Sequence, residues 1–455
     1  MQSRIDWHTS VALAWFQTLL QERFGHAFTL QAQTDGTLAL GLPGDARGII
    51  LTTDSATFTR ADSQLPFTQW DAAAEGWQSA LGTSLPAPGA TNLPVPLITP
   101  TAQGLHVAYD ILGLTYWMLS RQEEVGRTDL DEHGRFPATS SHAFKHGYLE
   151  RPIVDEWLHV LGQVIQRTWP GIALAQHRFS IKVSHDVDAP SRYAFKSWKG
   201  IARAVGGDVL KRGDVKSALL APWIRLNSQT ALHRQDPANT FDWIMDVSER
   251  HGLKSAFYFI CGRTVPSLDA DYEPEHPAIR ALMCRIHARG HEIGLHPSYG
   301  SYQKPEVIRA EAGRLRRIAR EEGIEQPEWG GRMHYLRWEQ PATLRAWADA
   351  GMNYDSTLGY ADRPGFRCGT CHEYPAFDPV EGIALPLRVR PLIAMECSIM
   401  ANAYMGLGTT KAAESKFFQL KDICRSVGGY FTLLWHNSQF ESAAERALYH
   451  AILSK

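Results

Sequence analysis

The chain has 455 residues, of which 44% are hydrophobic and 21% are charged, and it contains 14 Trp. This length suits two domains, because a single core usually stops growing beyond roughly 250 to 300 residues. Lys and Arg number 46 and Asp and Glu number 48, which gives a formal net charge of -2. The overall charge therefore does not favour nucleic-acid binding, which depends on neutralising phosphates.

The N-terminal sequence does not resemble a targeting segment. It lacks the uninterrupted apolar core of a secretory signal, and no run of 18 apolar residues occurs elsewhere. Six scattered cysteines do not form a disulfide framework for a protein of this size. We therefore expect a cytoplasmic chain that does not span a membrane and whose cysteines are reduced.

Residues 1–175 are expected to form a smaller α/β domain. A strand-like run covers 48–52, residues 83–104 are rich in Pro, Gly and Ala and are predicted to form a loop, and helical patterns cover 8–24, 106–124 and 152–168. The helical pattern over 106–124 ends in Arg121, Glu123 and Glu124. A surface or interdomain ion pair explains these charges better than a functional site does.

Residues 176–455 alternate short β-prone runs with amphipathic segments of helical length. The strands are predicted at 179–184, 255–260, 292–295 and 430–435, and the helices near 239–252, 276–289, 305–322, 340–350 and 411–427. This repetition favours a parallel (β/α) barrel over an open doubly wound sheet. The glycine-rich signatures of dinucleotide and phosphate binding are missing from the sequence, which argues against nucleotide chemistry.

Residues 189–238 form a long insertion between the first barrel strand and its helix. Three Asp and nine basic residues leave a surplus of six positive charges, and the basic residues are Arg192, Lys196, Lys199, Arg203, Lys211, Arg212, Lys216, Arg225 and Arg234. Trp198 and the apolar run Leu219–Ile224 accompany them. We predict a lid that meets an anionic or lipid-linked saccharide at the inner membrane surface. A solvated helical excursion is the alternative interpretation.

Four polar clusters follow predicted strands, where the functional residues of a parallel barrel gather. In the first cluster, Asp186 and Asp188 are two residues apart on an extended chain and can share one pocket. A metal ion would stabilise such a pair, and an Asx turn is an equally good interpretation of this segment taken alone. In the second cluster, residues 290–302, His296 ends a short strand and is either a zinc ligand or a hydrogen-bonded surface residue.

The third and fourth clusters supply further polar groups. Arg332 is suited to orienting a carboxylate, and His334 and Tyr335 lie beside it. His436 follows a strongly apolar strand that ends in Trp435, which suits an acid or base. By contrast, Cys368-Gly-Thr-Cys371-His372 is interpreted as a loop with incidental thiols, because a second ligand pair for a structural zinc is not apparent in the sequence.

These clusters resemble the polysaccharide deacetylase (NodB-homology) family over roughly residues 178–440. Ser184-His-Asp-Val-Asp188 resembles the segment that supplies a catalytic base and a metal ligand, and Gly290-His-Glu-Ile-Gly precedes His296 as in the family. Arg332 resembles the arginine that orients the base, and Leu433-Leu-Trp-His436 resembles the terminal acid motif. The resemblance implies a deformed parallel (β/α) barrel of the NodB-homology type in residues 176–455.

Three positions depart from the family pattern. Val187 separates the two aspartates, Met333-His334 replaces a Pro-Pro pair, and Gly300 stands where a second metal-binding histidine is expected. Either His334 or another residue completes the site, or the metal is weakly bound or absent. The N-terminal domain resembles a companion domain found with deacetylase-like domains in bacterial polysaccharide loci.

The resemblance implies a metal-dependent hydrolase that removes an N-acyl group, such as acetyl, from a saccharide or polysaccharide precursor. In this interpretation Asp188 and His296 hold a divalent metal, zinc by preference, and Asp186 is the base. The remaining roles are orientation of the base by Arg332, protonation of the leaving amine by His436, a metal or substrate contact by His334, and substrate binding by Tyr335 and Trp435. The alternatives are a hydrolase of another C–N bond, in a formamide or ureide, and a catalytically degenerate carbohydrate-binding protein.

Overall fold

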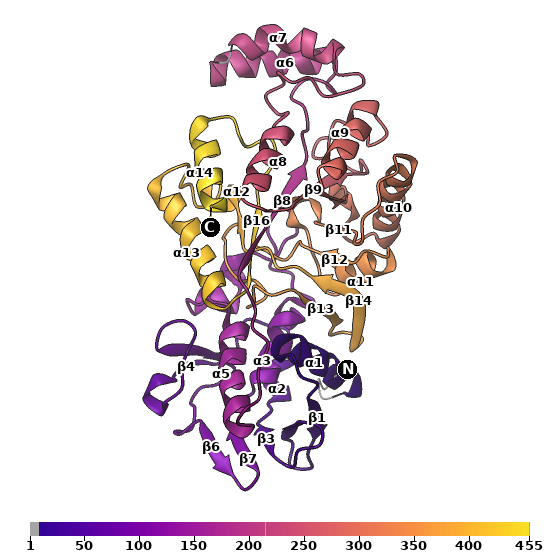
Figure 1. The fold of residues 1–455 in the computed structure, drawn as a ribbon. Coiled ribbons are helices and arrows are strands. Elements are labelled where there is room, and N and C mark those ends of the chain that lie inside the picture. The colour runs from indigo at the N-terminus through magenta and orange to yellow at the C-terminus, as the bar shows by residue number, and fades with distance from the viewer. Residues whose placement is uncertain (1–8, 214, 455) are drawn as a thin grey trace.

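The computed structural model describes residues 9–213 and 215–454. The strands of the two halves belong to separate sheets (Figure 1). In the N-terminal half, a five-stranded sheet has the order β1 (Thr29–Ala32), β2 (Leu38–Gly41), β3 (Gly48–Leu51), β7 (Gly104–Val107) and β6 (Ile98–Thr101). A separate antiparallel pair consists of β4 (Phe67–Asp71) and β5 (Ser84–Pro88).

The helices of this half are α1 (Ser10–Phe24), α2 (Ser55–Phe58), α3 (Ile111–Leu119), α4 (His142–Lys145) and α5 (Ile153–Thr168). The predicted helix over 106–124 is shorter than expected, because Asp110 caps it by accepting a hydrogen bond from the backbone N–H of Gly113. The predicted loop over 83–104 is wrong, since it contains β5 and β6. Each of these two strands has only one partner strand among the described residues, and such edge positions tolerate proline.

The C-terminal half is a mixed α/β unit with a large sheet of mostly parallel strands. In sheet order the strands are β13 (Tyr374–Asp378), β14 (Ile383–Val389), β12 (Tyr354–Asp355), β11 (Gly330–Gly331), β10 (Glu292–His296), β9 (Ser255–Ile260), β8 (Ser180–Val187), β16 (Tyr430–Leu434) and β15 (Ala394–Met395). Only β13 and β14 pair antiparallel among these strands as described. The strands and helices expected from the βα pattern are present, but the sequence did not reveal β11 to β15.

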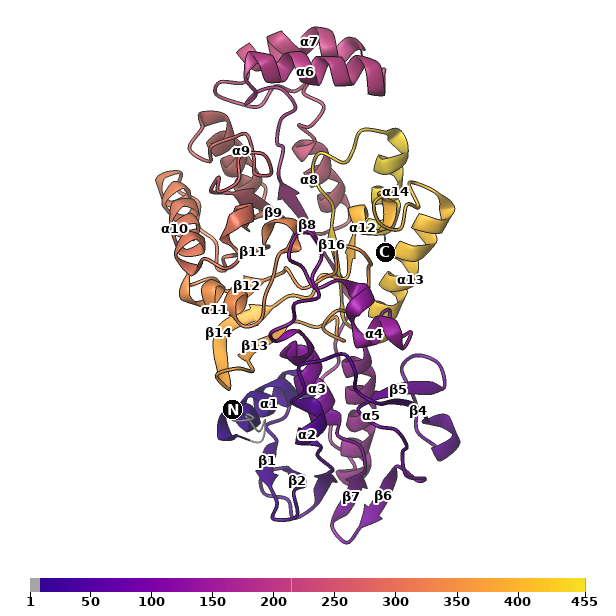
Figure 2. The same ribbon diagram turned by 180° about the vertical axis from the view of Figure 1, so that it is seen from behind.

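Helices cover this sheet on its outer side (Figures 1 and 2). They are α8 (Phe241–Arg250), α9 (Pro277–Ala288), α10 (Pro305–Glu321), α11 (Ala342–Asp349), α12 (Glu396–Met400), α13 (Lys411–Ser426) and α14 (Ala443–Leu453). The described residues include no helix that is both long enough and apolar enough to cross a bilayer.

The large sheet curves back on itself without closing through hydrogen bonds. β14 pairs with β12 near one edge, and β15 pairs with β16 at the other edge. Because only residues 390–393 separate β14 from β15, one short piece of chain joins the two edges. A closed barrel is therefore not formed by the described strands, and the expected barrel is an open, strongly curved sheet that is bridged by the chain itself.

The two halves share an apolar core. Buried residues from α1 and α3 belong to the same cluster as buried residues from β13, and Trp15 Nε1 donates to the Pro375 carbonyl at 2.8 Å. The predicted boundary near residue 175 therefore remains a proposal. Separate sheets agree with it, but the shared core means that the halves do not pack independently of each other.

The insertion forms a helical hairpin at one end of the molecule (Figures 1 and 2). It consists of α6 (Trp198–Gly207), the π-helical turn η4 (Asp208–Arg212) and α7 (Val215–Leu226). Asp214 and the side chains of Lys211 and Arg212, which were counted in the predicted basic segment, lie outside the described part of the chain.

Candidate active site

The polar clusters expected from the sequence lie around one pocket of about 400 Å³ at the carboxyl ends of the parallel strands. Asp186 and Asp188 come from the end of β8, His296 from β10, and His436 follows β16. Arg332 follows β11 and contacts Asp186 from outside the pocket lining. The carboxyl ends of neighbouring strands thus bring together residues that are up to 250 positions apart.

Asp186 and Arg332 form a buried ion pair. Arg332 Nη1 donates to Asp186 Oδ1 at 2.8 Å, Nη2 donates to the hydroxyl groups of Ser184 and Ser356, and Nε donates to the Ser356 carbonyl. Arg332 is fully buried and Asp186 is 2% exposed. The guanidinium is therefore held rigidly, and it fixes one oxygen of Asp186 while Asp186 Oδ2 faces His296 Nε2 at 3.7 Å.

Two glycines allow the strand that carries Arg332 to approach its neighbours. A Cβ atom at Gly331 would lie 1.8 Å from the Leu295 carbonyl oxygen, and one at Gly330 would lie 2.2 Å from the Tyr354 ring. Both distances are far below van der Waals contact, so neither position accommodates a side chain. The close approach places the Arg332 backbone where its carbonyl accepts a hydrogen bond from His296 Nδ1 at 2.6 Å.

Asp188, His296 and His334 form a group whose ligand atoms all lie within 4.8 Å of one another. Asp188 Oδ1 lies 3.3 Å from His296 Nε2 and 3.7 Å from His334 Nε2. Although Asp188 Oδ1 and His296 Nε2 are buried, neither has a hydrogen-bond partner among the described residues. Leaving buried polar atoms unsatisfied is costly, so the group fits a cation, and one carboxylate with two imidazoles is a zinc-type donor set.

His334 is oriented by a carboxylate that the sequence did not reveal. Its Nδ1 lies 3.2 Å from Asp269 Oδ1, so Nε2 faces Asp188. A carboxylate behind a histidine commonly fixes the ring of a metal ligand. Position 300 has no comparable role, because a Cβ at Gly300 would meet the Thr264 side chain at 2.9 to 3.0 Å. His334, rather than a residue at 300, is thus the third member of the group.

The charges of this group are mutually dependent. Burial opposes ionisation of Asp188, yet the His334 and His296 imidazoles hold the pKa of its carboxyl well below the usual range. Burial likewise disfavours a charged His296, but the Asp186 and Asp188 carboxylates raise the pKa of its imidazole. Without a cation, the carboxylates therefore favour a proton on the His296 imidazole, and a metal ion at this imidazole would displace that proton.

His436 lies on the other side of β8 from Arg332, and it is paired with a second unpredicted carboxylate. Its Nδ1 lies 2.5 Å from Glu396 Oε1, and its Nε2 lies 3.6 Å from Asp188 Oδ2. Burial would lower the pKa of this imidazole, but Glu396 raises it well above the usual value. This pairing favours the protonated imidazole of His436, whose Nε2 faces the pocket.

One wall of the pocket is strained and is contacted by the N-terminal half. Tyr335 and Leu336 both have left-handed backbone conformations, with φ of 61° and 55°, which are unfavourable for residues with side chains. Arg135 Nη1 donates to the Tyr335 carbonyl at 2.9 Å. Arg135 also lines the pocket, so the N-terminal half contributes to a site that the sequence assigned to the C-terminal half alone.

The structure contradicts the prediction that Trp435 binds substrate. This side chain is fully buried, donates from Nε1 to the Gln439 carbonyl at 2.8 Å and stacks on Phe440. Alternate residues of an extended strand point to opposite faces, so Leu434 and His436 line the pocket while Trp435 points into the core. Tyr335 does line the pocket, and Tyr404 is a second aromatic residue there.

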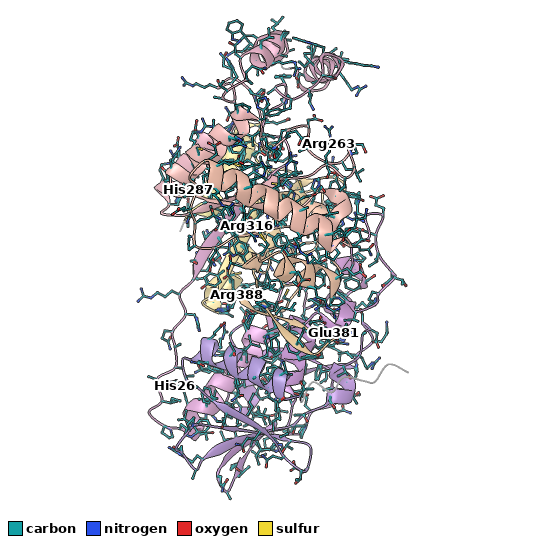
Figure 3. The ribbon with its side chains drawn as sticks, turned by 90° about the vertical axis from the view of Figure 1, so that its right-hand side faces the viewer. His26, Arg263, His287, Arg316, Glu381 and Arg388 are labelled. Carbon is teal, nitrogen blue, oxygen red and sulfur yellow. The ribbon has the colours of Figure 1, made fainter. Side chains whose placement is uncertain are left out.

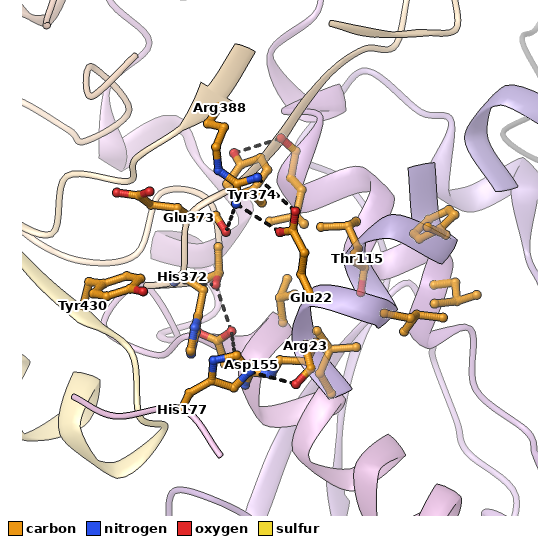
Figure 4. Close-up of a pocket in the computed structure, with 18 residues that line it drawn as sticks. Glu22, Arg23, Thr115, Asp155, His177, His372, Glu373, Tyr374, Arg388 and Tyr430 are labelled. Atoms are coloured by element: carbon orange, nitrogen blue, oxygen red, sulfur yellow. Dashed lines mark hydrogen bonds and ion pairs between the residues drawn. The ribbon is translucent and has the colours of Figure 1, made fainter. Parts of the chain in front are cut away.

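A second pocket, of about 240 Å³, lies between α1 and the C-terminal sheet (Figure 4). Asp155, Cys371 and His372 come together beside it. Asp155 accepts hydrogen bonds from the Thr370 hydroxyl at 2.8 Å and from the Cys371 backbone N–H at 3.0 Å. Asp155 thus connects the halves through these hydrogen bonds, and Cys368 and Cys371 are buried free thiols.

Among protein-family models, the match to this chain lies within its N-terminal half. A family of unknown function (DUF7033) matches residues 14–170. No curated protein sequence matches the chain.

Three solved structures are similar to the chain over its larger part. A protein assigned as a polysaccharide deacetylase from Mycobacterium smegmatis is 16% identical, with 63% of this chain and 84% of that chain covered and a TM-score of 0.39. The PuuE allantoinase is 13% identical, with 63% and 85% covered and a TM-score of 0.35. A protein assigned as a polysaccharide deacetylase from Pseudomonas aeruginosa PAO1 is 15% identical, with 61% and 84% covered and a TM-score of 0.36.

Proposed function

We propose that this chain is a metal-dependent hydrolase that removes an N-acyl group, such as acetyl, from a saccharide. The observation that carries the proposal is the arrangement of three units in one pocket. The pair Asp186–Arg332 supplies a carboxylate, the pair His436–Glu396 supplies a protonated imidazole, and unsatisfied ligand atoms of Asp188 and His296 lie between them. Hydrolysis of an amide requires a base for water and an acid for the leaving amine.

Asp188, His296 and His334 would hold the metal ion, for which their chemistry favours zinc. When bound, the cation would polarise the acyl carbonyl and acidify a water. Asp186 would take a proton from the attacking water as the water oxygen bonds to the acyl carbon, and the hydrogen bond from Arg332 would keep this carboxylate in position. His436 gives its Nε2 proton to the nitrogen of the sugar as the C–N bond breaks, and Glu396 stabilises the charged imidazole.

The pocket also suits a saccharide. Tyr335 and Tyr404 offer aromatic faces, and Leu336, Met395 and Leu434 add apolar surface. A sugar ring has apolar C–H faces that stack on aromatic rings, while its hydroxyl groups need polar partners such as the Arg135 guanidinium at the wall. The pocket volume of about 400 Å³ is sufficient for one or two sugar units.

The test pairs a metal assay with a screen of N-acylated sugars, measuring released acetate and free amine. Asp186→Asn should lower turnover by about 10²- to 10⁴-fold while metal content is retained, because it removes the base but no ligand. His296→Ala should lose both metal and turnover. Asp422→Asn, at an exposed carboxylate on α13, is the matched control and should change neither.

Three other results of these experiments would contradict the proposal. Full turnover by Asp186→Asn would show that another group is the base. Turnover of formamides or ureides, without release of acetate from sugars, would indicate a hydrolase of a different C–N bond. Saccharide binding without any turnover by the metal-loaded protein would indicate a carbohydrate-binding protein.

A further inference from the structure

The helical hairpin of residues 198–226 stands clear of the rest of the molecule. Figures 1, 2 and 3 show α6 and α7 side by side at one end, and Figure 3 shows Arg263 on the body below them. A small cluster of its own, separate from the main core, joins the two helices through Tyr193, Ile201, Ala221 and Ile224. One apolar face of α7 is therefore sufficient to hold the hairpin together.

A second apolar face of α7 is exposed. Val215, Leu219, Trp223 and Leu226 are spaced by four, four and three residues, which places them in one stripe of the helix. Their exposed fractions are 53%, 77%, 58% and 60%. Of the twelve large apolar residues that are exposed in the described chain, seven lie in the hairpin, since Trp198, Val209 and Leu210 join these four. Such a concentration marks an interaction surface.

The acidic and the basic side chains of the insertion differ in their exposure. Asp208 is buried and accepts hydrogen bonds from Arg192 Nη1 and the Tyr193 hydroxyl, and Asp236 is buried against Ser191. The described acidic side chains of the insertion are thus buried in internal hydrogen bonds, whereas Lys199, Arg203 and Lys216 are exposed. Lys216 lies on α7 with the apolar stripe, and Arg203 lies on α6 at the side that faces Arg263 and Asp271.

We propose that this hairpin is a membrane-surface anchor that docks on an anionic lipid bilayer. Leu219 and Trp223 would enter the headgroup region, where Trp is favoured, and Lys199, Arg203 and Lys216 would contact lipid phosphates. A second copy of the chain is a poor occupant of this surface. Pairing two identical hairpins would bring their surplus positive charges together, whereas an anionic bilayer complements them. This inference does not depend on the proposed hydrolase activity.

The experiment measures cosedimentation of the full chain with phosphatidylcholine vesicles, with and without added phosphatidylglycerol, at low and high salt. We expect binding to the anionic vesicles that weakens as salt rises. Lys199→Glu, Arg203→Glu and Lys216→Glu together should weaken binding more than about 100-fold, because each basic residue near the surface contributes about fivefold. Leu219→Ser with Trp223→Ser should weaken binding at least about tenfold and at every salt concentration.

Matched variants elsewhere on the surface separate this effect from general changes in charge or hydrophobicity. Lys145→Glu with Arg309→Glu and Lys411→Glu, and Val95→Ser with Ile383→Ser, change exposed residues outside the hairpin and should bind like the unmodified chain. An unchanged thermal unfolding midpoint should show that the hairpin variants fold. Failure of the unmodified chain to bind phosphatidylglycerol vesicles, or equal binding by the hairpin variants, overturns the proposal. A dimer in sedimentation velocity that Leu219→Ser with Trp223→Ser abolishes, without vesicle binding, also overturns it.

Discussion

Two buried charged clusters of this molecule differ in how their polar atoms are satisfied. Between the halves, Arg121 donates to Glu124, and Arg367 donates to both Glu124 oxygens at 3.0 and 2.5 Å. Arg121, Glu123, Glu124 and Arg367 form this interdomain cluster. Each of their buried side-chain nitrogen and oxygen atoms has a partner. In the pocket, by contrast, Asp188 Oδ1 and His296 Nε2 are buried without a hydrogen-bond partner among the described residues.

Buried charge alone therefore does not identify a functional site. Both clusters lie at the ends of regular elements, and both combine carboxylates with basic groups. Only the pocket cluster has unsatisfied ligand atoms directed at a shared point, which is the arrangement that a cation would complete. The interdomain cluster fulfils the expectation of an ion pair for Arg121, Glu123 and Glu124, and its role is to join the halves.

The largest effect is expected from breaking the interdomain cluster. Glu124→Ala leaves the buried Arg367 without its carboxylate, which should lower the free energy of unfolding by about 3 to 5 kcal/mol in urea titrations. Glu132→Ala, at a side chain that is 87% exposed, is the control and should cost less than about 0.5 kcal/mol. Metal content should not change in either variant. A loss below about 1 kcal/mol for Glu124→Ala would mean that the cluster does not join the halves as the geometry indicates.

A smaller effect is expected from loosening the pocket cluster. Asp269→Asn removes the charge behind His334 but no ligand, so zinc affinity should fall by about 10- to 100-fold in a chelator competition assay. Asp271→Asn is the matched control, because Asp271 is in the same loop and pairs with Lys196 instead. Equal affinity of the Asp269 variant and the unmodified chain would exclude His334 as a ligand oriented by this carboxylate.

The smallest effect concerns a neutral histidine beside the interdomain cluster. His142 Nε2 faces the Leu65 carbonyl at 3.0 Å and so donates to it, and burial lowers the pKa of this imidazole to about 4 from 6.5. As the pH falls, the unfolded chain therefore protonates His142 before the folded chain does. Its contribution to stability is complete above pH 6.5 and is lost as the pH falls towards 4.

His142→Gln should therefore flatten the acid side of the stability profile. Urea titrations at several pH values between 4 and 7 should show a slope that is smaller by up to about 1.4 kcal/mol per pH unit than in the unmodified chain. The same change is expected for His185→Gln, since burial lowers the pKa of that imidazole to about 3. An unchanged slope in both variants would show that these histidines are not held neutral.

The sequence was most informative where a polar residue directly follows a strand. Asp186, His296 and His436 could be placed at one edge of the sheet because strand ends of a parallel sheet converge. Asp269 could not be found in this way, because it lies nine residues beyond the end of β9 in an irregular loop. Glu396 follows β15, which has only two residues and carries no recognisable strand pattern. Both missed residues contact a histidine of the pocket, Asp269 contacting His334 and Glu396 contacting His436.

Errors in the predicted fold have a similar origin. Strands β11 to β15 are short or irregular, and their pairing depends on the curved sheet rather than on local alternation. The contact of Arg135 with Tyr335 depends on how the two halves meet, which local sequence does not encode. The direction of Trp435 was the exception, since alternation along the strand would have placed it opposite to His436.

The glycines before Arg332 have a consequence for recognising related chains. Because Gly331 lacks room for any side chain, a homologue that keeps this strand pairing and this arginine must keep the glycine as well. With His334 two positions after the arginine, the steric requirement becomes a readable signature, Gly-Gly-Arg-x-His. Genome searches with that pattern would find chains that combine this close strand pairing with the same arginine and histidine.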